Sequence, residues 1–172
     1  MITDEALERV RGWFTGRLPE DWRLEPPHVT VDREEITVVL TIPDVELAEA
    51  GAAERDEGRA GRAKAFREET RAKRIEIARE AEHRFERKVS WAVRVGDRTE
   101  LFTHVAAPVM TRLRQPQRQV LDTLVDSGVA RSRAEALAWC VRLVGEHESD
   151  WLAELREAMT HVADVRSKGP AA

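Results

Sequence analysis

The sequence has only one cysteine, Cys140, among its 172 residues. A single cysteine cannot form a disulfide within the chain, and it cannot supply the paired thiolates of a Cys-x-x-Cys site. The first residues are acidic where a secretory signal would be basic, so we expect a reducing, cytoplasmic location. Cys140 lies inside an apolar segment, which favours a role in packing over one as a nucleophile.

Long apolar runs are also missing. The longest run without proline covers only Ala136 to Val141, whereas about 20 apolar residues are needed to cross a bilayer. No membrane partner is therefore expected. Hydrophobic residues make up 42% of the chain and charged residues 35%, which is typical of a soluble globular protein with one domain or two small ones.

The usual signatures of catalysis do not occur. The five histidines form no His-Glu-x-x-His pair, and no Walker A, G-x-S-x-G or dinucleotide-binding pattern is present. Glu146, His147 and Glu148 are adjacent, so on a helix they point in different directions. The sequence predicts no catalytic residue, no metal site and no cofactor, and we do not expect an enzyme.

What the chain does have is a segregated distribution of charge. The net charge is -4, but acidic residues exceed basic ones in 1–54 and 146–172, and basic residues exceed acidic ones in 55–88 and 106–145. Basic zones attract phosphate, although the solvated faces of ordinary helices have a similar composition. Charge alone therefore does not select a partner.

Residues 1–105 predict an N-terminal module of the α+β class. Apolar spacing, β-branched runs and turn residues indicate, in order, a helix at 3–14, a hairpin of strands 29–31 and 36–42, a long helical region from 43 to about 88, and strands 89–95 and 101–105 around a turn at Gly96. The role of this module does not follow from its sequence.

The long helical region is interrupted by Gly58-Arg59-Ala60-Gly61. The order of helix, two strands, helix, glycine loop, helix and strand is similar to that of a type II KH domain, in which a GXXG loop clamps single-stranded nucleic acid. This resemblance implies that RNA is a possible partner. The alternatives are a break between two helices or a flexible loop, and Glu57 stands where that family has an aliphatic residue.

Residues 106–145 carry a second pattern. Val109 to Leu113 alternate as a strand does, residues 116–127 have helical spacing, and Gly128 suits the end of that helix. Ser132 then matches an N-cap, with Glu135 in place to close a capping box before an apolar helix from 134 to 144.

This tract resembles the ribbon-helix-helix (Arc/MetJ-like) DNA-binding family, and the residues that carry the likeness are 121–129 and 132–137. The resemblance implies a homodimer in which each protomer gives one strand to a ribbon in the major groove of double-stranded DNA. The implied function is a dimeric, sequence-specific DNA-binding protein that regulates transcription. A plain helical hairpin, or a structural scaffold that only dimerises, is the alternative.

The resemblance also implies particular roles for residues. On the strand, Met110, Arg112 and Arg114 share one face and would read bases, and at the start of the second helix Arg131, Ser132 and Arg133 would hold a phosphate. The second helix would pack against its twin through Leu137, Trp139, Cys140, Val141 and Val144. Residues 146–172 predict a last amphipathic helix with a loose tail.

Overall fold

The structure is a computed structural model that describes residues 4–46 and 51–168, apart from the side chains of 160 and 163–168. The chain divides into two compact units, Met1–Pro108 and Val109–Ala172, and each is described by itself. The expected segment 146–172 belongs to the second unit. The α+β class predicted from the sequence is confirmed.

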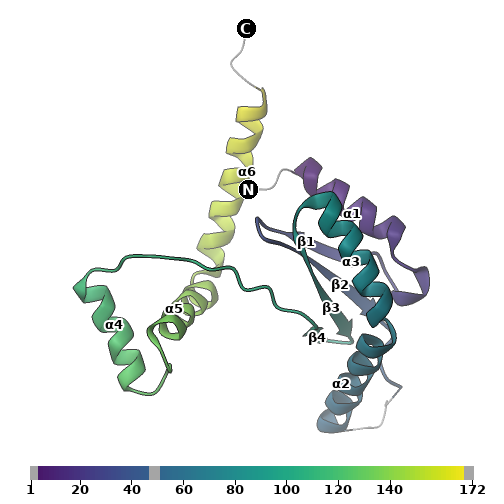
Figure 1. Cartoon of the computed structure of the whole chain (residues 1–172), viewed down its shortest axis with the longest axis horizontal. Helices are drawn as coiled ribbons and strands as arrows, with labels where there is room; N and C mark the ends of the chain where they lie inside the picture. The colour runs from purple at the N-terminus through teal and green to yellow at the C-terminus, as the bar shows by residue number, and fades with distance from the viewer. Residues whose placement is uncertain (1–3, 47–50, 169–172) are drawn as a thin grey trace. The chain divides into compact units, whose positions relative to one another are not determined.

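The first unit is a four-stranded sheet with helices packed on it (Figure 1). The sheet order is β1-β2-β3-β4, with β2 and β3 parallel and the outer pairs antiparallel. The predicted hairpin at 29–42 is confirmed, whereas the fourth strand begins earlier than expected. In chain order the elements are α1 (Asp4–Arg17), a short 3-10 helix (Glu20–Trp22), β1 (His28–Val31), β2 (Glu35–Ile42), α2 (Ala52–Glu69), α3 (Arg71–Phe85), β3 (Lys88–Val95) and β4 (Arg98–Leu101).

The core lies between one face of the sheet and the helices. Along β2 every second residue is buried, because side chains alternate between the two faces of a strand. The buried set includes Ile36, Val38 and Leu40, and Phe14 of α1 and Ile77 of α3 pack against it. The opposite face mixes polar and apolar side chains: across β2 and β3, Thr37 pairs with Ser90 and Val39 with Ala92.

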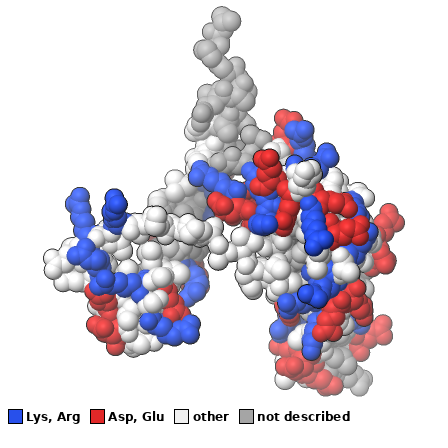
Figure 2. All heavy atoms as spheres, in the orientation of Figure 1, with Lys and Arg blue, Asp and Glu red and all other residues white. Residues whose placement is uncertain are grey.

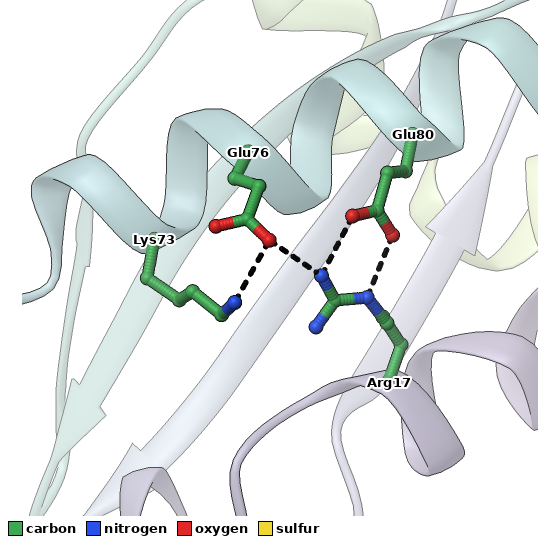
Figure 3. A network of polar contacts seen from close by, with 4 residues as sticks. All are labelled: Arg17, Lys73, Glu76 and Glu80. Carbon is green, nitrogen blue, oxygen red and sulfur yellow. Dashed lines mark hydrogen bonds and ion pairs between the residues drawn. The ribbon is translucent and has the colours of Figure 1, made fainter.

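An ionic cluster fastens α1 to α3, which lie side by side (Figure 1). Arg17 at the end of α1 donates from Nε and Nη2 to the two carboxylate oxygens of Glu80, at 2.6 and 2.7 Å. Nη2 also reaches Glu76, which accepts from Lys73 (Figure 3). The hydrogen bond from Arg17 holds the pKa of Glu80 below its usual range. This bidentate geometry fixes the spacing of the two helices.

The glycine loop expected at 58–61 does not exist, because α2 runs unbroken from Ala52 to Glu69. The break between helices comes at Thr70 instead. Arg59 of the glycine segment donates to Asp44 at 3.0 and 2.7 Å and also contacts Asp97. These two ion pairs connect α2 to the ends of β2 and β3, so Arg59 stabilises the fold. The prediction that residues 58–61 form a loop that clamps single-stranded nucleic acid is wrong.

The second unit consists of α4 (Gln115–Asp126), α5 (Arg133–His147) and α6 (Ser149–Lys168). The strand expected at 109–113 does not form. A strand needs a neighbour to accept its backbone hydrogen bonds, and no described strand of this chain pairs with that segment. The two helices and the turn between them are confirmed, with Gly128 at a φ of 79° where a left-handed residue ends α4.

Candidate functional site

A cleft of about 630 Å³ opens between α1 and the end of α3. Its volume is in the range of small-molecule sites. No acidic side chain is among the described residues that line it, which are Ala6, Arg9, Val10, Gly12, Trp13, Arg84, Phe85 and Arg87. The cleft is therefore a basic site with two aromatic rings.

A series of aromatic contacts connects the two rings of the cleft to the core of the unit. Trp91 of β3 meets Phe14 edge to face, Phe14 meets Trp13, and Trp13 meets Phe85, with ring centroids 6.1, 4.9 and 5.7 Å apart. Trp13 and Phe85 are half-buried, so part of each ring remains accessible. This series of edge-to-face contacts fixes the orientation of the two rings in the cleft.

The three arginines of the cleft differ in their contacts. Arg87 is anchored, because it donates from Nε to the carbonyl of Asp32 at 2.8 Å and from Nη1 to that of Phe85 at 3.1 Å. The guanidinium of Arg84 lies 5.7 Å from the centroid of the Phe85 ring. Arg9 and Arg84 are exposed, and within the described residues neither forms an ion pair with a carboxylate.

This combination suits a ligand that carries both negative charge and a flat ring. Guanidinium groups donate planar, bidentate hydrogen bonds to phosphate, and aromatic faces stack with nucleobases. Sequence reasoning missed the site, although Arg9 and Trp13 are four residues apart on one helix face. The approach of α1 to Arg84 and Phe85 is a tertiary contact, and the spacing of residues in the sequence does not reveal it.

The residues predicted to read bases lie in the second unit. Met110 is 97% exposed, and Arg112 and Arg114 are exposed in a segment without regular structure. Figure 2 shows basic side chains gathered around this segment and the start of α4. The amide of Arg114 donates to Gln117 at 2.9 Å, which caps α4. Without a strand these side chains have no common face.

The residues predicted to hold a phosphate are engaged within the chain. Arg133 donates to both carboxylate oxygens of Asp122 at 2.6 and 2.8 Å, which lowers the pKa of that carboxyl. Arg131 pairs with Glu135 at 3.2 Å. Ser132 is the N-cap of α5, as predicted, since its hydroxyl accepts from the amide of Glu135. In a capping box the Glu135 carboxylate would accept from the amide of Ser132. It accepts instead from the amide of Arg131, at 2.8 Å.

The residues predicted to form a dimer interface differ in their burial. Leu137 and Cys140 pack against the small core of this unit, formed by Leu121, Ala130 and Ala136. Trp139 is half-buried. Val141 and Val144 are exposed, at 65% and 48%. The α4–α5 hairpin thus covers part of the apolar surface of α5 within a single chain.

Neither a metal cluster nor a membrane-spanning helix occurs in the part of the chain that the structure describes. Its residues contain no group of three or more His, Cys, Asp or Glu side chains that could hold a metal ion. None of its helices is long and apolar enough to cross a membrane.

Comparison with known proteins assigns most of the chain. Residues 8–101 match the family model described as Rv1265-like protein, N-terminal domain, and residues 114–166 match the model described as Mb1296 C-terminal domain. The uncharacterized protein Mb1296 of Mycobacterium bovis and the uncharacterized protein Rv1265 of Mycobacterium tuberculosis are each 61% identical to this chain over 158 residues. That alignment covers 92% of this chain and 69% of each relative.

These matches overturn the resemblance to ribbon-helix-helix proteins. The tract that carried it, residues 121–137, falls inside the region of the Mb1296 C-terminal domain. A turn closed by glycine and followed by a serine N-cap is a general way to join two helices, so the likeness was one of local structure. No solved structure matches the chain significantly.

Proposed function

The chain belongs to the Rv1265-like protein family, and we propose that its first unit binds single-stranded nucleic acid in the cleft between α1 and α3. The observation that carries the proposal is the meeting of three arginines and two oriented aromatic rings in one cleft whose described lining has no acidic side chain. Phosphate contacts supply affinity in nucleic-acid binding, and stacking on aromatic rings is open to any base.

A single strand fits this site better than a duplex. The bases of a duplex are stacked on one another, so their faces cannot reach Trp13 or Phe85. In a single strand a base can lie against these rings while the neighbouring phosphates meet Arg9 and Arg84. Arg87, held by two backbone carbonyls, would act as a fixed donor beside them. A free nucleotide offers the same groups once, so it should bind more weakly.

The proposal is tested by fluorescence anisotropy of the full chain with labelled oligouridylate, oligothymidylate and a duplex of mixed sequence. We expect the single strands to bind more tightly than the duplex, with affinity that falls as salt rises. In the double variant Arg9→Gln and Arg84→Gln, affinity should fall about tenfold. The slope of log affinity against log salt should also become shallower, by about 0.7 for each phosphate that the variant no longer neutralises.

The matched control is Arg79→Gln, which removes an exposed arginine of α3 that does not line the cleft. It should bind as the wild type does. Equal affinity of the wild type and the double variant for single strands would refute the proposal. Tighter binding of the duplex than of single strands, by both the wild type and the double variant, would also refute it.

A second proposal concerns the second unit, where we infer that two copies of the chain associate through α6. Trp151, Leu155, Met159 and Val162 recur at intervals of three or four residues and are 41% to 55% exposed. Such spacing forms one apolar stripe along a helix, and two identical stripes can pack together. The described core of this unit contains only three buried residues, so association would supply burial that one chain lacks.

A further inference from the structure

Arg74 is a buried cation without an acidic partner. It lies in the first turn of α3 with only 6% of its surface exposed. Buried charges are normally paired with an opposite charge, yet within the described residues no carboxylate binds Arg74. Its Nε donates to the hydroxyl of Thr70 at 3.0 Å, and its Nη2 donates to the carbonyl of Arg67 at 2.6 Å.

The guanidinium keeps unused donors. It has five N–H groups, and these two bonds occupy one each, at Nε and Nη2. The Nη1 group donates to no acceptor among the described residues. Nη1 of Arg74 is therefore the donor that a ligand at this position would use.

Two more arginines flank Arg74. Arg71 comes three residues earlier on α3, a spacing at which helical side chains are neighbours, and Arg67 lies over the same aromatic ring as Arg74. The guanidinium groups of Arg74 and Arg67 are 4.8 and 5.7 Å from the centroid of the same ring, that of Phe102. Burial and then the positive charges of Arg67 and Arg71 lower the pKa of Arg74 to about 10, so it remains charged at neutral pH. Three like charges gathered at one helix junction repel one another, and a bound anion would relieve that repulsion.

We propose that Arg67, Arg71 and Arg74 bind a phosphate group at the junction of α2 and α3. A phosphate suits this site because it accepts bidentate hydrogen bonds from planar guanidinium groups and can carry more than one negative charge. Thr70, the backbone carbonyl of Arg67 and the ring of Phe102 orient Arg74 before any ligand arrives, so little ordering remains to be done on binding.

This site is separate from the cleft. Arg74 and Arg84 are ten residues apart on α3, which corresponds to about 15 Å along a helix. Between them on α3 lie Glu76 and Glu80, both bound to Arg17 (Figure 3). A phosphate at the junction therefore does not depend on the proposed binding of nucleic acid in the cleft, and each can fail alone.

The test uses inorganic phosphate and the full chain. Thermal unfolding is followed while sodium phosphate replaces sodium chloride at constant ionic strength, and binding is measured by calorimetry. The double variant Arg67→Gln and Arg71→Gln removes two exposed side chains and leaves the buried Arg74 in place. Arg79→Gln, on the same helix, is the control for a lost surface charge.

We expect phosphate to raise the Tm of the wild type and of Arg79→Gln, because a ligand that binds only the folded state stabilises it. In the double variant the affinity for phosphate should fall about tenfold or more, since two charged donors have been removed. The variant Arg9→Gln with Arg84→Gln should respond as the wild type does, which separates this site from the cleft.

A Tm rise that is the same in the wild type and the double variant would overturn the proposal, because it would reflect the general effect of phosphate on protein surfaces. The absence of any rise in the wild type would overturn it as well. Competition by oligouridylate would identify a nucleic-acid backbone as the source of the phosphate, and lack of competition would identify a free phosphate or a small phosphorylated molecule. Both of these outcomes support the site, since each requires phosphate bound through Arg67 and Arg71.

Discussion

Trp13 of α1 and Phe85 of α3 meet edge to face, with ring centroids 5.7 Å apart and ring planes at 84°. These residues are 72 positions apart in the sequence, and their contact sets one wall of the basic cleft. Because each ring restrains the other, an incoming base would find a surface that is already ordered. The contact therefore links the packing of the two helices to the proposed binding of a single strand.

The Trp13 side chain should contribute by stacking rather than by charge. Replacing Trp13 with Leu removes the aromatic face and should weaken binding of single strands by about 1 to 3 kcal/mol for the base that it contacts. Trp13→Phe keeps a ring and should retain most of the affinity. Both variants are measured by anisotropy, with circular dichroism to confirm folding. Equal affinity of the folded Leu and Phe variants would contradict stacking at this position.

The Arg17 cluster predicts a dependence of stability on pH. The hydrogen bond from Arg17 lowers the pKa of Glu80, and hydrogen bonds from Lys73 and Arg17 lower that of Glu76. A carboxylate with a depressed pKa in the folded state stabilises the fold above its unfolded pKa, and the effect is lost as pH falls through the folded pKa.

The change that tests this is Arg17→Gln. Its Tm should lie below that of the wild type at neutral pH, and the gap should narrow below about pH 4.5, the ordinary pKa of glutamate. Arg79→Gln should show no such pH-dependent gap. A gap for Arg17→Gln that stays constant or widens at acid pH would show that the ionic cluster does not stabilise the pairing of α1 and α3.

Two glycines should respond in opposite ways to alanine. Gly61 lies within α2 with no atom within 4 Å of an added Cβ, so Gly61→Ala should stabilise the protein by roughly 0.5 to 1 kcal/mol. Gly96 has a φ of 59°, and an added Cβ would lie 2.5 Å from Oδ2 of Asp44. Gly96→Ala should therefore cost about 1 to 2 kcal/mol.

Both variants are compared by chemical denaturation. Gly61→Ala should also leave nucleic-acid affinity unchanged, because Gly58 to Gly61 form helix rather than a binding loop. A loss of stability or of binding in Gly61→Ala would show that α2 is broken at this point after all.

The elements that could be predicted from the sequence are those that local chemistry determines. β-branched alternation located β1 and β2, and Gly128 and Ser132 located the turn between α4 and α5. The glycines of 58–61 misled because an isolated glycine weakens a helix without ending it, and Arg59 ties this part of α2 to Asp44 and Asp97. Those partners are distant in sequence, so their effect could not be predicted.

The cleft was missed for a related reason. Charged residues such as Arg9, Arg84 and Arg87 are typical of the solvated faces of ordinary helices. Only the packing of α1 against the end of α3 brings these three together. Two of the basic residues that the sequence did emphasise, Arg131 and Arg133, form ion pairs with carboxylates of their own unit instead. A charge that is counted in the sequence is available to a ligand only if the fold leaves it without a partner.

The apolar stripe of α6 predicts self-association. Trp151, which is 53% exposed, should lie in the contact between two copies, so Trp151→Glu would place a charge there and shift the protein to the monomer. Sedimentation velocity over a range of concentrations measures this shift. Glu154→Gln, on the same helix but outside the stripe, serves as the control. A wild type that stays monomeric across that range would contradict the proposal.

Binding of a single strand in the cleft can be located on the chain by photo-crosslinking. The full chain is crosslinked to an oligouridylate that carries 4-thiouridine, and the linked peptides are identified by mass spectrometry. We predict crosslinks in the peptides that contain Trp13 or Phe85, and their loss in Arg9→Gln with Arg84→Gln. Crosslinks confined to residues 109–118 of the second unit, with none in α1 or at the end of α3, would contradict the proposed site.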